Sequence, residues 1–331
     1  MATSHGLSPG SAWHHRYAKL VAACTVLLIA AGASVTSTNS GLSVPDWPTT
    51  YGWNMFTFPL GKMVGGIRYE HTHRLIASTV GFMTIILAVW TWRVESRRWV
   101  RWLGVACLGA VILQGVLGGI TVLFFLPPAV SIGHAGLAQI FFCLTLTLAV
   151  VTSPRWRDPQ SPVDDRLLRG LATATTAAVY VQILLGATMR HTNSGLAIPD
   201  FPLAFGHLLP PVWNPHVAIH FAHRAGAAIV TALILATAGH LWHHRARRRE
   251  LIRTVNALVF FVAVQIALGA FVIWSGKDPV INSLHVVNGA LVLGTSLVLT
   301  LRTWRSAGLE PVGVRVPRPQ VNPPLRAEAR P

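Results

Sequence analysis

Four histidines stand at matching places in the two halves of this sequence, each inside an otherwise apolar segment. His73 and His223 each come directly before an arginine, and His134 and His285 each lie near the start of a later apolar segment. The two pairs repeat at separations of 150 and 151 residues. A single histidine in a membrane-crossing segment is often only a hydrogen bond between helices, but ionisable side chains there are costly and usually line a functional cavity. Four of them in a repeated frame indicate one site in each half.

Two histidines on facing helices of one bundle suit a particular cofactor. Helix bundles build cofactor sites from side chains on facing helices, and two neutral imidazoles on opposite sides of one iron give a six-coordinate haem. Zinc normally takes four ligands, and the apolar segments contain no cluster of thiolates or carboxylates. Arg74 and Arg224 follow the first histidine of each half. We expect them to pair with haem propionates, the alternative being that they only extend to the membrane interface.

The histidines are repeated together with a longer motif. The sequence from 38 to 48, TNSGLSVPDWP, reappears from 192 to 202 as TNSGLAIPDFP, 154 residues later. Such internal similarity is typical of a duplicated unit. The pattern Gln-x-x-Leu-Gly also recurs, beginning at Gln114, Gln182 and Gln265. Its glycine lets a flat macrocycle or a neighbouring backbone approach closely.

The two halves differ three residues before the first histidine of each. Glu70 precedes His73, whereas His220 precedes His223. Residues three apart share one face of a helix, so Glu70 is expected to point toward the same cavity as His73. There a carboxylate can move protons or stabilise developing positive charge. The alternative is an acid favoured by the N-terminal end of a helix, but the polar His220 at the matching position favours a functional role.

The composition places these residues in a membrane. Of the 331 residues, 52% are hydrophobic and 11% are charged, where soluble domains average about 25% charged. About 20 apolar residues cross the hydrocarbon core as a helix, and a lipid-exposed backbone must satisfy its own hydrogen bonds. Eight segments qualify: 18–36, 70–92, 102–124, 130–151, 170–189, 217–240, 252–274 and 282–302. We therefore predict an all-α integral membrane protein with eight transmembrane helices, arranged as two duplicated four-helix bundles.

This assignment divides the chain into five parts. Residues 1–17 form an N-terminal tail, 18–152 the first four-helix half, and 153–169 a linker. Residues 170–303 form the second half, and the Pro- and Arg-rich residues 304–331 are expected to be a disordered tail. Any chemistry must then lie among the helices and the two long outer loops.

Arginines set the expected orientation. They gather in alternate connections: Arg93, Arg97, Arg98, Arg101, Arg155, Arg157, Arg166, Arg169, Arg245, Arg247, Arg248, Arg249 and Arg253, followed by Arg302 and Arg305. The positive-inside rule therefore predicts that both termini are cytoplasmic. The net charge of +16 is mostly this signal, and its division among short loops argues against a nucleic-acid partner. His5, His14 and His15 fall in the N-terminal tail and are expected to be solvated or interfacial.

Together these motifs resemble the haem A synthase family. Eight segments in two halves, E-x-x-H-R beginning at Glu70, H-x-x-H-R beginning at His220, and the single histidines His134 and His285 carry the resemblance over residues 18–303. It implies a bacterial-type plasma-membrane oxidoreductase, acting on CH groups, that converts the C8 methyl of haem O to the formyl group of haem A. Haem O synthase and the assembly of cytochrome oxidase are the associated partners.

The resemblance also implies different roles for the two halves. The C-terminal half would hold a haem b cofactor, with His223 and His285 as axial ligands of the iron and Arg224 beside it. The N-terminal half would receive the substrate haem between His73 and His134.

Two further roles in the N-terminal half follow from the resemblance. Glu70 would be the catalytic acid, and Arg74 would contact the substrate haem. Many bacterial members also carry a cysteine pair in an outer loop. Here Cys24, Cys107 and Cys143 all lie in apolar segments, where such residues mostly act as small hydrophobes, so a mechanism that needs the pair cannot operate. The electron donor and any homo-oligomer are left open.

Two other functional classes use the same residues. A di-haem b-type electron-transfer protein would need the four histidines but no catalytic Glu70, and only an enzyme would convert haem O to haem A. A haem or metal transporter would need an alternating cavity. The scarcity of charged residues and of proline breaks in the middle of the segments argues against the transporter.

Overall fold

The computed structural model describes residues 9–157, 165–245 and 248–305, and these are almost entirely helical. Eight helices are long and apolar enough to cross a membrane. They are α1 Pro9–Ser37, α2 Gly65–Val94, α3 Arg98–Leu123, α4 Pro128–Val151, α6 Arg166–His191, α7 Pro215–His244, α8 Arg249–Trp274 and α9 Pro279–Trp304. The short helix α5 (Pro154–Arg157) and the 3₁₀ turn η1 (Leu60–Lys62) lie in connections. The predicted all-α fold with eight membrane-spanning helices is confirmed.

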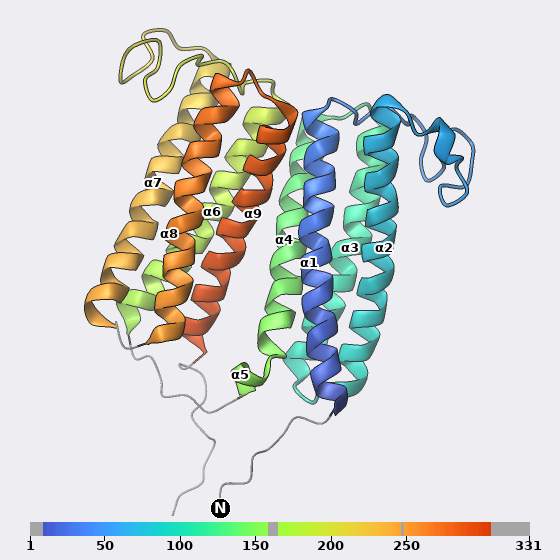
Figure 1. The fold of residues 1–331 in the computed structure, drawn as a ribbon, viewed down its shortest axis with the longest axis vertical. Helices are drawn as coiled ribbons and strands as arrows, with labels where there is room; N and C mark the ends of the chain where they lie inside the picture. The colour runs from blue at the N-terminus through green and yellow to red at the C-terminus, as the bar shows by residue number, and fades with distance from the viewer. Residues whose placement is uncertain (1–8, 158–164, 246–247, 306–331) are drawn as a thin grey trace, which may run out of the picture.

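The long helices pack in two groups of four (Figure 1). Helices α1 to α4 contact one another in a ring, as do α6 to α9. The two groups meet along α1 and α4 on one side and α6 and α9 on the other. This arrangement is consistent with the predicted pair of four-helix bundles.

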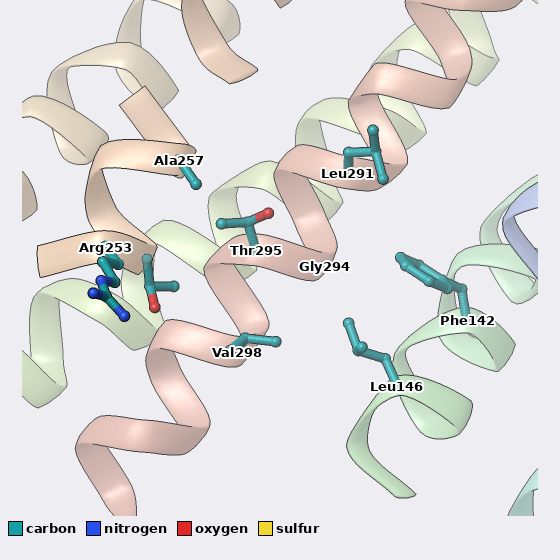
Figure 2. A pocket seen from close by; sticks show the side chains of 9 residues that line it. Phe142, Leu146, Arg253, Ala257, Leu291, Gly294, Thr295 and Val298 are labelled. Atoms are coloured by element: carbon teal, nitrogen blue, oxygen red, sulfur yellow. The ribbon is translucent and has the colours of Figure 1, made fainter. Parts of the chain in front are cut away.

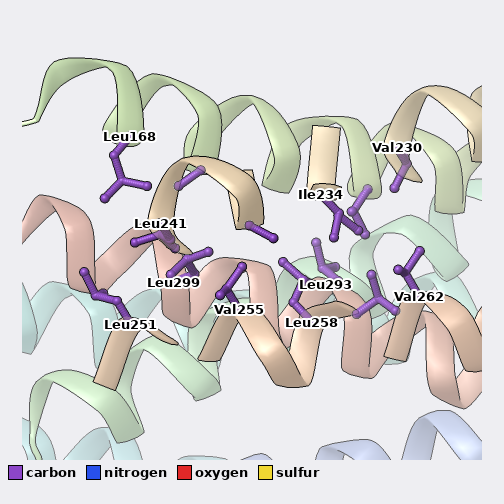
Figure 3. Close-up of a cluster of buried hydrophobic side chains, with 14 residues drawn as sticks. Leu168, Val230, Ile234, Leu241, Leu251, Val255, Leu258, Val262, Leu293 and Leu299 are labelled. Atoms are coloured by element: carbon purple, nitrogen blue, oxygen red, sulfur yellow. The ribbon is translucent and has the colours of Figure 1, made fainter. Parts of the chain in front are cut away.

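Each group has its own apolar interior. In the C-terminal group, leucines, valines and isoleucines from all four helices meet in one cluster, which includes Leu168, Ile234, Leu258 and Leu293 (Figure 3). Large apolar side chains also cover the outside, as expected for a surface in contact with lipid. Phe82 and Phe260, for example, are 64% and 62% exposed. Close packing of small and branched side chains, more than removal from water, holds such helices together in a bilayer.

The first helix begins earlier than predicted. Helix α1 starts at Pro9, so part of the expected tail 1–17 is helical. His14 is buried, its Nε2 lies 2.9 Å from the Thr91 hydroxyl, and its ring packs against Trp90. The expectation that His14 is solvated or interfacial was therefore wrong. Hydropathy alone missed this helix turn because its polar side chains find partners on α2.

The linker between the halves is also partly helical. Helix α6 is capped by Asp165, whose carboxylate accepts a hydrogen bond from the Leu168 amide at 2.9 Å. His240 and Arg245 reach the same carboxylate at 2.9 and 3.1 Å. Burial acts to raise the pKa of Asp165, but the hydrogen bonds outweigh it and hold the pKa below its usual value. The rest of the linker (158–164), most of the predicted tail (306–331), and His5 lie outside the described residues.

Two long loops lie at the same end of the molecule (Figure 1). One joins α1 to α2 (38–64) and the other joins α6 to α7 (192–214). Each closes on one isolated antiparallel bridge, Thr50 with Trp53 and Ala204 with His207. The repeated sequence motif thus adopts a repeated conformation.

An aspartate organises the same turn in each loop. Asp46 accepts a hydrogen bond from the Gly52 amide at 2.8 Å, and Asp200 accepts one from the Gly206 amide at 2.7 Å. Both glycines have a φ of +77°, a region that L side chains rarely adopt. Burial acts to raise the pKa of Asp46, but the bonds from Gly52 and Thr49 outweigh it and lower the pKa. The Gly206 amide lowers the pKa of Asp200.

Candidate functional site

The four histidines singled out by the sequence lie at one level near the loop-bearing end of the helices. His73 on α2 and His223 on α7 are each eight residues beyond the first residue of their helix. His134 on α4 and His285 on α9 are each six residues beyond theirs. All four helices begin at the end that carries the long loops, so each group of four contains one pair of imidazoles at matched depth (Figure 1).

Each imidazole rests against a glycine of the preceding long helix. A Cβ atom added to that glycine would lie 3.0–3.3 Å from Cε1 of the histidine ring, which is closer than ordinary contact. The pairs are Gly32 with His73, Gly118 with His134, Gly186 with His223 and Gly269 with His285. Three of these glycines belong to the Gln-x-x-Leu-Gly pattern. The fourth, Gly32, was missed, although its place 154 residues before Gly186 was a usable signal.

Glutamines of the same pattern hold three of the four histidines. The Nε2 atoms donate to the histidine backbone carbonyls and also lie 3.0–3.5 Å from a ring nitrogen: Gln114 to His134, Gln182 to His223 and Gln265 to His285. The remaining histidine, His73, has Leu28 at the position that corresponds to Gln182. The His73 ring is therefore held by fewer polar contacts than the other three.

The polar atoms of the two histidine pairs are satisfied to different degrees. In the N-terminal half, the Nδ1 atoms of both His73 and His134 are buried without a hydrogen-bond partner among the described residues. In the C-terminal half, the rings of His223 and His285 face each other with their centroids 6.5 Å apart and their planes 65° apart. Buried polar atoms without partners call for an explanation, and a missing ligand is one.

These features fit haem better than a metal ion held by protein alone. Among the residues that the structure describes, no group of three or more His, Cys, Asp and Glu side chains could hold a metal. Two imidazoles are the number that a haem iron needs from the protein. A metal–imidazole bond is about 2 Å long, so the separation of His223 and His285 leaves room for one metal ion between them. The geometry of the C-terminal pair therefore fits a bis-histidine haem iron, and the N-terminal half offers the same two ligand types at the same level.

Arg74 binds the outer loop of its half. Its Nη1 donates to the carbonyls of Asp46 and Thr49 at 2.7 and 2.9 Å, and its Nη2 donates to the carbonyl of Val44 at 2.9 Å. The side chain is only 9% exposed. The guanidinium group is thus occupied by loop carbonyls.

Arg224 repeats this arrangement in the second half. It donates to the carbonyls of Asp200, Leu203 and Ile198 at 2.6, 2.8 and 3.2 Å. We expected both arginines to pair with haem propionates. In the described structure both arginines bind loop carbonyls, because the turn of each loop presents several carbonyls to one planar cation. Pairing with propionates stays a prediction.

Glu70 completes this contact in the first half. Its Oε2 accepts from the Val44 amide at 2.8 Å, and its Oε1 accepts from Arg74 at 2.7 Å. The side chain is 4% exposed. Both carboxylate oxygens are therefore directed to the loop and its arginine, and no hydrogen bond joins Glu70 to His73, in contrast to the orientation that the i, i+3 spacing suggested.

His220 occupies the same place in the second half. Its Nδ1 lies 3.2 Å from the Ile198 amide and its Nε2 lies 3.2 Å from Arg224 Nε. A carboxylate accepts two such bonds at once, whereas a neutral imidazole accepts at one nitrogen only. The two residues are thus equivalent in position but not in bonding capacity.

Trp47 packs next to the candidate site, and the sequence did not single it out. A Cβ on Gly119 of α3 would lie 2.7 Å from the Trp47 ring, so the indole lies directly on this helix, one residue beyond the glycine behind His134. At the corresponding position Phe201 contacts Trp274, with ring centroids 6.2 Å apart. A usable signal in the sequence was that both loop motifs have an aromatic residue directly before a proline, Trp47 in the first and Phe201 in the second.

Comparison with known proteins agrees with this geometry. A family model described as cytochrome oxidase assembly protein, COX15-CtaA, matches residues 54–297. The chain belongs to this family. Three curated proteins named heme A synthase are similar over most of their length. The relative from Symbiobacterium thermophilum is 32% identical over 75% of this chain and 81% of its own; the figures are 29%, 85% and 95% for Halalkalibacterium halodurans, and 28%, 88% and 92% for Geobacillus kaustophilus.

The arginine–loop contact can be tested in this COX15-CtaA protein by hydrogen exchange. Arg74→Ala removes bonds to three loop carbonyls and the ion pair with Glu70. A hydrogen bond to a charged group contributes about 1.5–3 kcal/mol, so the amides between Val44 and Gly52 should exchange at least about tenfold faster, measured by mass spectrometry. Arg68→Ala, which removes an exposed cation stacked on Tyr69, is the control. Unchanged exchange in Arg74→Ala would show that the loop holds itself.

Proposed function

We propose that this protein is a haem A synthase, a membrane oxidoreductase that oxidises the C8 methyl group of haem O to the formyl group of haem A. The observation that carries the proposal is two pairs of imidazoles at one level, one pair in each group of four helices, with each ring packed against a glycine, in a member of this family. Relatives that match most of the chain bear the same name. The product links the protein to cytochrome oxidase assembly, as the family description does.

The C-terminal half, residues 170–303, is proposed to hold haem b as a resident cofactor. His223 and His285 are its axial ligands, with Gln182 and Gln265 fixing the two rings. Full support from both glutamines favours a permanent, low-spin site.

The N-terminal half, residues 18–152, is proposed to bind the substrate haem between His73 and His134. The partnerless Nδ1 atoms of both rings support this, because a site that exchanges its occupant is expected to be less completely satisfied without it. Trp47 covers the outer side, and the exposed apolar surface around the bundle gives the farnesyl tail of haem O access from the lipid. Arg74 would act on the substrate through the loop that it holds.

The reaction needs an oxidant that protein side chains cannot supply. Haem provides that chemistry when bound. Each of two successive hydroxylations replaces a C–H bond of the methyl group by a C–O bond and removes two electrons from the carbon, which an oxidant from outside the chain must accept. The resulting geminal diol loses water to leave the aldehyde. The chain's own residues bind and orient the substrate and exclude water with the outer loop.

Glu70 is proposed to be the catalytic residue that handles protons near the substrate. Its position beneath the loop, bonded to Arg74, places a carboxylate within one helix turn of His73. The competing explanation is that Glu70 only anchors the loop, as His220 does in the other half. The two explanations differ in what each substitution should do.

Both termini are proposed to be cytoplasmic and the long loops external, in the plasma membrane of a bacterial-type cell. The arginine-rich connections all lie at the end opposite the long loops, which supports this orientation through the positive-inside rule.

Removal of a proposed axial ligand should abolish the cofactor spectrum. We expect His223→Ala or His285→Ala to eliminate the low-spin haem b signal in the purified protein, measured by optical and paramagnetic resonance spectroscopy. His216→Ala, on the same helix as His223 but bonded to Ser194 in the loop, should retain it. A full bis-histidine spectrum in both ligand variants would refute the C-terminal site.

The role of Glu70 can be separated from loop anchoring by comparison with His220. Glu70→Ala should reduce haem A formation at least about 100-fold, the usual contribution of a general acid or base, while haem b remains. Haem O or a hydroxylated intermediate should accumulate in extracts analysed by mass spectrometry. His220→Ala removes the equivalent loop contact without removing a carboxylate and should keep haem A formation. Equal losses in the two variants, or none in Glu70→Ala, would assign Glu70 to anchoring.

The orientation predicts the location of reporter fusions. Fusions at Arg97 and Trp156 should report the cytoplasm, and fusions at Trp53 and Gly206 should report the outside. A cytoplasmic signal at both Trp53 and Gly206 would reverse the proposed topology without affecting the assignment of the histidines.

A further inference from the structure

We propose that an anionic phospholipid binds in the seam between the two bundles, at the end opposite the long loops. Its acyl chains would fill the apolar grooves on either side of α4, and its phosphate would meet basic residues at their mouths. This site is independent of the haem sites and of the proposed function.

The seam between the two bundles is tightly packed at the middle of the helices and open toward the arginine-rich end. Ile29, Phe142 and Ala290 form a buried contact between α1, α4 and α9. Toward the arginine-rich end, the two groups of helices diverge (Figure 1). Two cavities of about 350 and 320 Å³ open there, and Phe142 and Leu146 line both.

The first cavity lies between α4 and the pair α8 and α9 (Figure 2). Its walls are small or apolar, including Ala257, Gly294 and Thr295. Gly294 is needed for this shape, because a Cβ there would lie 2.9 Å from the Phe142 ring. The second cavity lies between α1 and α4 and is lined by alanines and Val26. Smooth apolar grooves that face the bilayer suit hydrocarbon chains.

Each cavity also has one cation in its lining, Arg253 in the first and Lys19 in the second. Arg302 lies beside the first cavity, where it donates to the hydroxyl of Thr254, another lining residue. Glu250 lies 3.7 Å from Arg155, so its charge is already partly balanced. Positive charge therefore exceeds negative charge at these mouths.

Apolar grooves with cations at their mouths favour an anionic lipid over other ligands. Basic pockets between transmembrane helices on the cytoplasmic side bind anionic lipid headgroups, and each nearby Lys or Arg contributes about fivefold to the affinity. A soluble anion would not use the apolar walls. A zwitterionic lipid has a phosphate too, but its ammonium group offsets the attraction to the cations. The isoprenoid tail of a haem held at the histidines is the other hydrocarbon available, but the histidines lie at the opposite end of the helices.

The test uses the full-length protein reconstituted into vesicles of phosphatidylglycerol or of phosphatidylcholine, followed by extraction and native mass spectrometry. We expect the wild type to retain phosphatidylglycerol and to lose phosphatidylcholine. Arg253→Gln should lower the retention of phosphatidylglycerol about fivefold, and Ala257→Phe, which fills the groove, should lower it further.

Two matched controls separate the site from general effects. Arg98→Gln removes an exposed cation from the same end of α3, and Ala263→Phe places the same bulky side chain on an exposed position of α8 outside the groove. Both should retain lipid as the wild type does. Equal retention of the two lipids, or equal losses in variants and controls, would overturn the proposal. Retention of haem O in place of phosphatidylglycerol in the same mass spectra, lost in Ala257→Phe, would also overturn it, in favour of a substrate tail.

Discussion

The contact of an imidazole with a glycine on the preceding long helix sets the geometry of each half. A side chain at any of these four glycines would displace the ring, so helix spacing and ring position are fixed together. In a bilayer, small residues let helices approach closely, and packing replaces much of the hydrophobic driving force of soluble proteins. The glutamines then fix three of the rings through their backbone carbonyls. The same contacts therefore determine both how the helices pack and where the imidazoles lie.

The outer loops depend on a second repeated interaction. One arginine per half, buried in the first half and half-buried in the second, donates to several loop carbonyls, and an acceptor one turn earlier completes the contact. Duplication preserved this framework while the acceptor diverged to Glu70 in one half and His220 in the other. Because a carboxylate accepts both bonds and a neutral imidazole accepts one, the first loop is held more strongly. The same substitution gives the first half a carboxylate, which is anionic when ionised, where the second half has an imidazole.

The halves differ in how completely their histidines are supported. Gln182 bonds the His223 ring, whereas Leu28 stands at the corresponding place near His73. A duplicated fold can thus keep one site for permanent occupancy and leave the other less satisfied and able to exchange its ligand.

The sequence by itself determined the eight helices, the duplication and the four histidines, because hydropathy, repeat spacing and charge are local and periodic signals. It also indicated three of the four glycines that contact the imidazoles. Only the tertiary structure decided what Arg74, Arg224 and Glu70 contact. The loop carbonyls that accept from the arginines and the loop amide that donates to Glu70 lie 21 to 30 residues away along the chain. It likewise buried His14, because the partner that makes burial favourable, Thr91, is on another helix. Periodicity shows which face a side chain is on, but its bonding partners depend on how distant segments are brought together.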